Sequence, residues 1–463
     1  MVLESVLYAP AMDELFGDAA LIQAMFDFEA ALVRAQAELG LIPETSARSI
    51  ASLCRAELYD VPALVKAAGT AGTVAIPLVR RLIENVSLFD PVAAAFVHQG
   101  ATSQDVIDTA LVLQTRKALR LIEADLLRLC GRLLALADAH KGQPLLARTL
   151  MQPALVTGWR CKILQWLQPL LRSAAELRRQ ADAALRLQLG GAAGTLATLG
   201  QHADAVCHQV SAQLQLPLSN GPWHVQRDRW VRLGAELGVL CGSLGKIGRD
   251  LALMSQAEVG ELAEGQTPGR GGSSAMPQKR NPVGAMVALA AAQRAPHRVA
   301  CLLSCMVQEQ ERALGGWQAE QAEWSGLLLS CHGSVHALAD AFEHLQVFPA
   351  RMLENIDAQQ DLVFAEGLRQ LLTRELGRPV GEEAIAELIA GVQAGRGPLR
   401  LLAQELLRRL GHLPGRVAPA DLEMLFDVHA TARAAEARLQ PWLQQARGEF
   451  KSLQQGGGPG HEG

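Results

Sequence analysis

One loop carries the side chains best suited to chemistry. It spans residues 265–284, reads GQTPGRGGSSAMPQKRNPVG, and lies between two long stretches with helical periodicity. Its glycines let backbone N–H groups approach a ligand, and its hydroxyls, cations and amide could bind an anion beside a base or nucleophile. The side chains concerned are Ser273, Ser274, Lys279, Arg280 and Asn281. A plain flexible connection is the alternative, since loops of this composition also serve only as links.

Two histidines have the spacing of metal ligands. His332 and His336 are four residues apart, which places both imidazoles on one face of a helix. No third ligand is apparent near them in the sequence, and Cys301 and Cys305 at the same spacing are typical of helix-core residues. The chain also lacks a P-loop, a dinucleotide-binding glycine motif and a hydrolase nucleophile elbow. We therefore expect no metal and no cofactor.

The composition indicates a large folded protein. Its 463 residues are 49% apolar and 19% charged, which is enough hydrophobic material for an extensive core. The 43 basic and 47 acidic residues give a net charge of −4 without a basic stripe, so nucleic acid is not an expected partner. The eight cysteines form no CxxC pair, and no stretch reaches the roughly 18 apolar residues of a membrane span. With an N-terminus free of a basic leader, we expect a cytoplasmic protein without a membrane partner.

Helical periodicity dominates the elements that must position the loop. Apolar residues from Ile122 to Leu136 and from Leu233 to Met254 alternate spacings of four and three, the pattern of bundle helices. The second run places Gly234, Gly238 and Gly242 at intervals of four, which predicts close approach of another helix, within the chain or between subunits. Strand patterns are scarce and aromatic residues make up 4%, so we expect an all-α fold.

Composition shifts divide the chain into four segments. We expect an N-terminal helical domain over residues 1–110 and a central long-helix bundle over 111–355, which carries a mobile catalytic loop at 265–284. A C-terminal helical domain is expected over 356–453, and the segment 454–463 has the composition of a disordered tail.

The loop sequence GSSAMPQKRNP resembles the signature of the fumarase/aspartase superfamily, which includes argininosuccinate and adenylosuccinate lyases. Within it, the chain is most similar to the bacterial branch that cyclises 3-carboxy-cis,cis-muconate. The segments that carry this likeness are HQGATSQDVIDTA at 98–110, LGGAAGTLATLG at 189–200, PWHVQRDR at 222–229 and ERALGGWQAE at 311–320. The resemblance implies three domains, a central bundle completed in a homotetramer, and active sites assembled from three subunits.

The resemblance also implies roles for individual residues. Ser273 matches the catalytic base, and Lys279 and Asn281 match the groups that stabilise a dianionic aci-carboxylate intermediate, where positive charge is chemically sensible. An Arg–Asp pair within PWHVQRDR could instead be structural, and His224 beside it is a possible acid. The implied substrate-binding residues are His98, Thr102, Ser103, Gln104, Arg148, Thr149, Gln152, His224, Gln226, Arg227, Ser274 and Met276.

The chain departs from the superfamily pattern in one place that matters for chemistry. Many relatives carry a histidine in the segment aligned with Thr149–Pro153, and this chain has none there. The second acid or base is therefore left open.

The function implied by the resemblance is intramolecular lactonisation of the tricarboxylate 3-carboxy-cis,cis-muconate to a carboxymuconolactone, a step of protocatechuate catabolism. A fumarate-releasing lyase of the adenylosuccinate or argininosuccinate type is the alternative enzyme. A non-catalytic helical scaffold is the alternative of another class, although an intact loop with Ser273, Lys279 and Asn281 argues against it.

Overall fold

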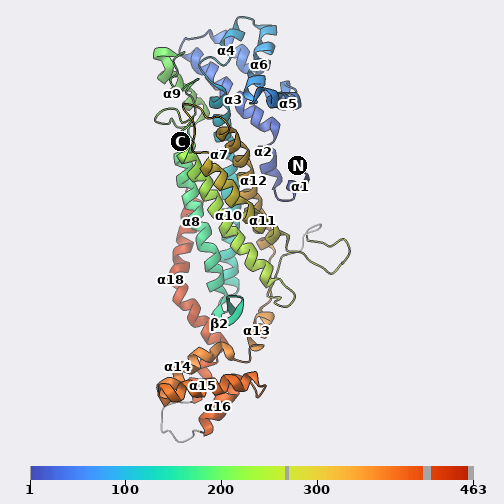
Figure 1. The fold of residues 1–463 in the computed structure, drawn as a ribbon, viewed down its shortest axis with the longest axis vertical. Coiled ribbons are helices and arrows are strands. Elements are labelled where there is room, and N and C mark those ends of the chain that lie inside the picture. Colours follow the sequence, from blue (N-terminus) through green and yellow to red (C-terminus); the bar gives the residue numbers. More distant parts are fainter. Residues whose placement is uncertain (1, 266–270, 410–418, 457–463) are drawn as a thin grey trace.

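Long helices lying side by side form an elongated bundle (Figure 1). The structure is a computed structural model that describes residues 2–265, 271–409 and 419–456. The prediction of an all-α fold with a central bundle is confirmed. The long helices are α7 (Ser103–Ala139), α8 (Trp159–Ala184), α10 (Asp228–Met254), α11 (Val283–Ser304), α12 (Gly316–Glu343) and α18 (Val428–Gln455).

Shorter elements occupy the two ends of the bundle (Figure 1). α1 (Val2–Ser5) and α2 (Pro10–Leu15) lie alongside the long helices. The elements at the N-terminal end are α3 (Asp18–Glu38), α4 (Glu44–Leu53), η1 (Ala56–Leu58), α5 (Val61–Ala71), α6 (Ala75–Phe89), η2 (Ala93–Phe96), η3 (Gly200–His202) and α9 (Ala203–Leu214). Those towards the opposite end are α13 (Pro349–Asp357), η4 (Leu362–Phe364), α14 (Ala365–Leu376), α15 (Arg378–Gln393), α16 (Leu399–Arg409) and α17 (Pro419–Leu425). Among the described residues, no helix combines the length and hydrophobicity that a membrane crossing requires.

Two antiparallel pairs contain the strands of the described chain. β1 (Pro144–Thr149) and β2 (Gln152–Gly158) form a hairpin, and β3 (Leu262–Ala263) pairs with β4 (Gln346–Val347). The tight turn of the hairpin holds Leu150 and Met151 at positive φ, and Leu150 is 97% exposed. This hairpin links α7 to α8, so it places Arg148 and Gln152 at the end of the bundle remote from the start of α7.

The apolar stripes predicted from periodicity are the buried faces of the bundle. The five residues of the run from Ile122 to Leu136 in α7 are at most 7% exposed. The seven residues of the run from Leu233 to Met254 in α10 are at most 5% exposed. Burial of these stripes drives the helices together, because each fully buried Leu or Ile side chain contributes about 1.5–3 kcal/mol.

Glycines in α10 permit close contact with α11. A Cβ at Gly238 would lie 2.7 Å from Val299 Cγ2, and one at Gly245 would lie 2.3 Å from Ala292 Cβ. Close helix packing within the chain is thereby confirmed for Gly238, whereas a Cβ at Gly242 would meet nothing within 4 Å.

The predicted segment boundaries fall inside helices of the structure. Residue 110 lies inside α7, and the first ninety residues share one hydrophobic core with the bundle. The C-terminal helix α18 returns along α8 (Figure 1). Its apolar side chains Leu443 and Leu453 are buried in that same core. α18 also continues through Gln455, two residues into the expected tail. Residues 266–270 of the predicted loop and 457–463 of the predicted tail lie outside the described residues.

The α10–α11 contact generates a test of packing. Gly245→Ala should destabilise the protein by about 1–3 kcal/mol, because the added methyl group overpacks Ala292. Gly242→Ala is the matched control and should be neutral or stabilising by up to about 1 kcal/mol, since alanine is the better helix former. Urea unfolding at one fixed protein concentration measures both, and equal midpoints would contradict the close contact.

Candidate active site

Arg312 organises the hydroxyl-rich segment at the start of α7. Its guanidinium donates to Thr102 Oγ1 at 2.6 Å, to Ser103 Oγ at 3.1 Å and to Gln104 Oε1 at 3.3 Å. All three acceptors are neutral, and among the described residues no carboxylate pairs with this arginine. A half-buried cation surrounded by hydroxyl and amide groups is suited to binding a carboxylate.

Arg312 lies in the segment ERALGGWQAE, but the sequence did not lead us to predict it as a site residue. The usable signal was an arginine just before the glycine pair Gly315–Gly316 that leads into a long helix, a position from which a side chain can reach a neighbouring helix start. Its partners lie more than two hundred positions away in the chain, so spacing alone could not identify them.

A buried carboxylate, Asp105, joins three segments beneath Arg312. Asp105 is 0% exposed and accepts hydrogen bonds from the backbone N–H groups of Gly190 and Gly191, at 3.0 and 2.9 Å. It also accepts from the N–H of Thr102 at 3.0 Å and lies 2.7 Å from Nε2 of His224. His224 is itself 3% exposed, so its ring is committed to holding this carboxylate in place.

Arg227 is buried completely between two carboxylates. It donates to Asp108 at 2.7 Å and to Glu320 at 3.1 Å, and its Cζ lies 4.6 Å from the ring centroid of Trp223. Asp108 is held further by Nε1 of Trp317 at 3.0 Å. Arg227 therefore forms a structural ion pair, but its carboxylate partners come from α7 and α12 and not from the adjacent Asp228, which lies 3.7 Å from Arg232. A buried triad of this kind fixes helix positions, because removing one member strands an uncompensated charge.

His98 lies at the same end of the molecule with a constrained backbone. It adopts a φ of 62°, and its Nδ1 lies 2.6 Å from Oε1 of Glu29, a carboxylate that is 0% exposed. Burial alone would lower the pKa of the imidazole, but the charge and hydrogen bond of Glu29 outweigh burial and raise that pKa above its ordinary value. The protonated form of His98 is thereby favoured.

The hairpin carries a second group of predicted residues. Arg148 makes a bidentate contact with the buried Glu261, at 2.8 and 3.1 Å, and Asn355 Nδ2 donates to the same carboxylate at 2.9 Å. Thr149 and Gln152 flank the exposed turn and face solvent. Gln226, from the other predicted segment, is exposed too, and its amide donates to Pro222 O at 3.3 Å.

The described part of the signature loop, residues 271–284, projects away from the bundle before α11 (Figure 1). Ser273 Oγ accepts from the N–H of Met276 at 3.1 Å, and Nδ2 of Asn281 donates to Gly272 O at 3.3 Å. The side chains of Ser274, Met276 and Lys279 are exposed. Together these contacts give the described part of the loop a local turn that presents its hydroxyl, amide and cation outward.

The base of this loop is anchored in two ways. The hydrogen bond from the N–H of Asn281 to Gly271 O, 2.9 Å long, closes its neck. The carboxylate of Glu264 accepts from the first N–H groups of α11, those of Gly284 and Ala285, at 2.9 Å each. Glu264 therefore caps the positive end of α11 and ties the loop to the bundle.

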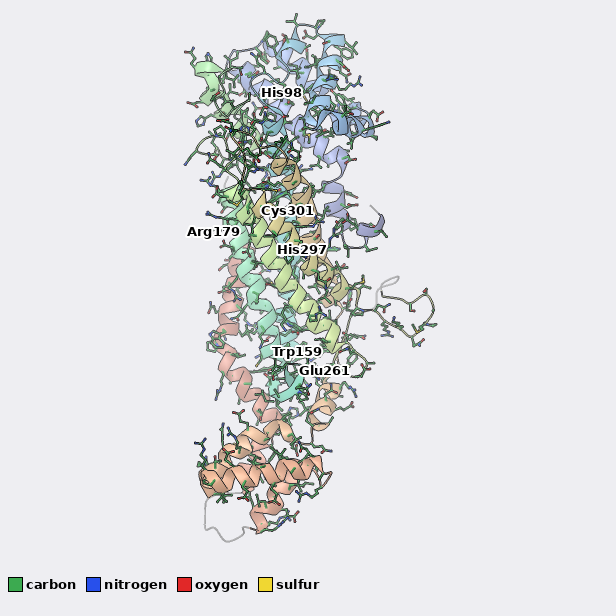
Figure 2. The ribbon with its side chains drawn as sticks, viewed as in Figure 1. His98, Trp159, Arg179, Glu261, His297 and Cys301 are labelled. Atoms are coloured by element: carbon green, nitrogen blue, oxygen red, sulfur yellow. The ribbon has the colours of Figure 1, made fainter. Side chains whose placement is uncertain are left out.

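One chain does not bring the predicted residues together. His98 lies at one end of the bundle, and Glu261, the partner of Arg148, lies near the other end (Figure 2). The helix α7 separates them by about 55 Å along its axis, at 1.5 Å per residue. The groups at the start of α7 are thus remote from the hairpin, whereas the signature loop begins four residues after Glu261, the partner of Arg148.

The sequence near His332 and His336 shows no third ligand, but the tertiary structure supplies one. Both ring systems face Asp125 of α7, and the three side chains place possible ligand atoms within 4.8 Å of one another. The carboxylate comes from a helix distant in sequence, which is why inspection of the neighbouring residues did not reveal it.

Comparisons with known proteins agree with this architecture. A family model described as "Lyase" matches residues 5–296. A 3-carboxy-cis,cis-muconate cycloisomerase of Pseudomonas aeruginosa is 41% identical over 451 residues, which cover 97% of this chain and 96% of that protein. A nitrosuccinate lyase of Streptomyces davaonensis is 36% identical, with 92% of each chain covered. The crystal structure of the 3-carboxy-cis,cis-muconate lactonizing enzyme from Pseudomonas putida matches with a TM-score of 0.88 at 38% identity, covering 98% of this chain and 99% of that one.

The helical bundle and the signature loop are those of a lyase-type enzyme. The chain belongs to the fumarase/aspartase superfamily. The resemblance drawn from GSSAMPQKRNP is confirmed, and the match extends over nearly the whole chain.

The pair of His98 and Glu29 predicts a pH-dependent contribution to stability. Because the pKa of His98 is raised in the folded state, the contribution is fully present below pH 6.5 and is lost as the pH rises through the raised pKa. His98→Gln should therefore cost roughly 1–2 kcal/mol at acidic pH and less at alkaline pH. Chemical unfolding between about pH 5.5 and pH 9 measures this, with His208→Gln on exposed α9 as the control. A cost independent of pH would contradict the charged pair.

Proposed function

We propose that the chain catalyses the intramolecular lactonisation of 3-carboxy-cis,cis-muconate to a carboxymuconolactone. The observation that carries the proposal is Arg312, a cation held by the neutral acceptors of Thr102, Ser103 and Gln104 and therefore available to a substrate carboxylate. Relatives named for this reaction, 40–45% identical, support the choice of substrate. The setting would be catabolism of aromatic acids through protocatechuate.

The chemistry follows from a carbanion held by the signature loop. A carboxylate oxygen of the substrate attacks one carbon of a double bond, and the displaced electron pair moves to the neighbouring carbon and into its carboxylate. Lys279 and Asn281 stabilise the resulting dianionic aci-carboxylate, since their positive charge and amide donor meet charge as it develops. Ser273 delivers the proton to that carbon and removes it in the reverse direction.

Ser273 needs help to act as a base near neutral pH. A serine hydroxyl ionises poorly, so its alkoxide must be stabilised by donors. The N–H of Met276, which already donates to Ser273 Oγ at 3.1 Å, is one such donor in the described loop. Exclusion of water around Lys279 would strengthen the stabilisation of the alkoxide by this N–H group and by the Lys279 cation. This chemistry requires acid, base and charge stabilisation only, so the proposal includes no cofactor.

The remaining predicted residues divide into binding and positioning groups. We assign His98, Arg148, Thr149, Gln152, Gln226, Ser274 and Met276 to the surfaces that meet in the assembled site. Arg227 and His224 position α7 and its neighbours, since both are buried and bonded to carboxylates. The second acid or base is left open, because no histidine occupies positions 149–153.

We propose further that the site is completed in a homotetramer. The start of α7 and the hairpin of one chain lie at opposite ends of α7, too far apart to act on one small molecule. Apolar side chains are exposed on the long helices, with Val239 of α10 57% exposed and Met286 and Leu303 of α11 50% and 52% exposed. Packing of these faces against other chains would bury them and bring surfaces from different subunits together.

The cytoplasm is the compartment that we propose from the redox state of the cysteines. All eight are free thiols, and six of them are buried. Burial raises the pKa of Cys207 to about 11 and that of Cys130 to about 12, which keeps both thiols protonated and unreactive. Structural thiols of this kind are typical of a reducing compartment.

A fumarate-releasing lyase is the second candidate. The 36% identity to a nitrosuccinate lyase favours it, because that protein is named for elimination from a substituted succinate. The same loop chemistry would serve, and fumarate release near 240 nm would distinguish the two reactions.

The first assay follows the ultraviolet absorbance of 3-carboxy-cis,cis-muconate mixed with the purified protein. Lactonisation destroys the conjugated diene, so we expect a rapid loss of absorbance that a chelator does not slow and that Ser273→Ala abolishes. Absence of any loss would reject the cycloisomerase and direct the assay to succinyl-substituted substrates. Inactivity there too would favour a scaffold.

Substitutions of Lys279 and Arg312 test whether one active site uses residues from different subunits. Lys279→Ala and Arg312→Ala should each lower turnover by at least about a hundredfold without changing the assembly, since each removes one charge-stabilising donor. If sites draw on different subunits, unfolding and refolding the two variants together should restore part of the activity, because some mixed sites contain both native residues. Lys66→Ala, an exposed change on α5, is the control. Mixtures as inactive as the separate variants would contradict a site shared in this way.

A further inference from the structure

Two histidines and an aspartate converge between α7 and α12, which run side by side in the bundle (Figure 1). His332 and His336 lie one turn apart on α12. Nε2 of His332 lies 3.2 Å from Oδ2 of Asp125, and Nδ1 of His336 lies 2.8 Å from that same oxygen. Two imidazole nitrogens and one carboxylate oxygen therefore face a common point, and all three lie within 4.8 Å of one another.

The surroundings orient these groups towards that point. Nε2 of His336 lies 3.5 Å from Oδ2 of Asp340, the arrangement in which a carboxylate holds the far nitrogen of a metal-binding imidazole. Arg128 contacts Oδ1 of Asp125 at 3.1 Å and Oδ1 of Asp340 at 2.7 Å. Because Arg128 binds Oδ1, it leaves Oδ2 of Asp125 directed at the histidines.

The side chains of this cluster are less exposed to solvent than those of an ordinary surface ion pair. The side chain of His332 is 3% exposed and that of Asp125 is 16% exposed, whereas His336 is 37% exposed. Nδ1 of His332 is buried and has no hydrogen-bond partner, so the contact with Asp125 is the one polar interaction that offsets the burial of this ring within the described structure. The cluster is thus closed towards the core and open to solvent beside His336.

We propose that His332, His336 and Asp125 form a binding site for a divalent first-row transition metal ion such as Zn²⁺. Two imidazole nitrogens from positions i and i+4 and one carboxylate oxygen from a facing helix are a donor set typical of zinc. Ligand atoms at tetrahedral zinc lie about 3.3 Å apart, given bonds of about 2.0 Å, so small side-chain shifts accommodate the ion. Solvent beside His336 supplies the fourth ligand as water.

The ion would act as a structural cross-link rather than in catalysis. Asp125 lies about 33 Å along α7 from Ser103, at 1.5 Å per residue, and so is remote from the Arg312 surface. A metal held by both helices stabilises the folded state by a free energy that grows with the logarithm of its affinity. This role is additional to the proposed function and independent of it, since the lactonisation chemistry makes no use of these side chains.

Cobalt binding tests the site directly. The full-length protein, freed of metal by a chelator and dialysed, is titrated with Co²⁺ alone, whose visible absorption intensifies in tetrahedral nitrogen and oxygen coordination. We expect one equivalent per chain and competition by Zn²⁺. His336→Ala and Asp125→Asn should each weaken binding by at least about tenfold, as expected when a ligand is lost.

His297→Ala is the matched control, because His297 is an exposed histidine on the neighbouring helix α11 and should leave binding unchanged. Thermal melting verifies that each variant is folded, and Asp125→Asn preserves the side-chain shape if His336→Ala does not fold. Absence of a cobalt spectrum, or a spectrum unaffected by both ligand substitutions, would overturn the proposal. Since no step measures turnover, the outcome is separate from that of the lactonisation assay.

Discussion

Asp105 is the interaction on which the arrangement of the polar end depends. A carboxylate with no exposure to solvent must have its charge compensated by donors, and here two glycine N–H groups, the N–H of Thr102 and the ring of His224 supply them. These donors come from the start of α7, from the loop that follows α8, and from the segment that precedes α10. The positions of three segments are thereby coupled. The same geometry sets the hydroxyls of Thr102 and Ser103 beneath Arg312, so the presentation of the anion surface is a consequence of a buried charge being satisfied.

A second buried charge stabilises the same end from within. Arg227 is enclosed by Asp108 of α7, Glu320 of α12 and the ring of Trp223. These contacts connect the helices that flank the Arg312 surface. The desolvation of such a group is costly, and it is offset only while every partner stays in place. This makes the triad a strict constraint on the relative positions of α7, α10 and α12. The two buried or half-buried arginines at this end therefore differ in their partners. Arg227 is neutralised by carboxylates, whereas Arg312 donates to neutral acceptors.

Rigid helices impose the other main constraint. The bundle holds the start of α7, the hairpin and the signature loop on different parts of one chain, and α7 alone sets about 55 Å between its ends. The chemistry proposed for a small tricarboxylate needs these groups within a few ångströms of one another, and for this reason the proposal includes association of chains. Long helices whose glycine-lined faces pack inside the chain, and whose apolar faces remain exposed elsewhere, are well suited to that association.

The sequence by itself determined the helical class, the buried stripes of α7 and α10, and the superfamily through GSSAMPQKRNP, because periodicity and a contiguous motif are local properties of the chain. It also led to Ser273, Lys279 and Asn281 as candidates. Only the tertiary structure decided that Arg312 meets Thr102 and Ser103, that Arg227 is paired with Asp108 and Glu320, and that Asp125 joins His332 and His336. Each of these contacts joins residues far apart in sequence. Their meeting depends on which faces of the helices pack together, and the spacing of residues along one helix contains no information about the helix that will lie against it.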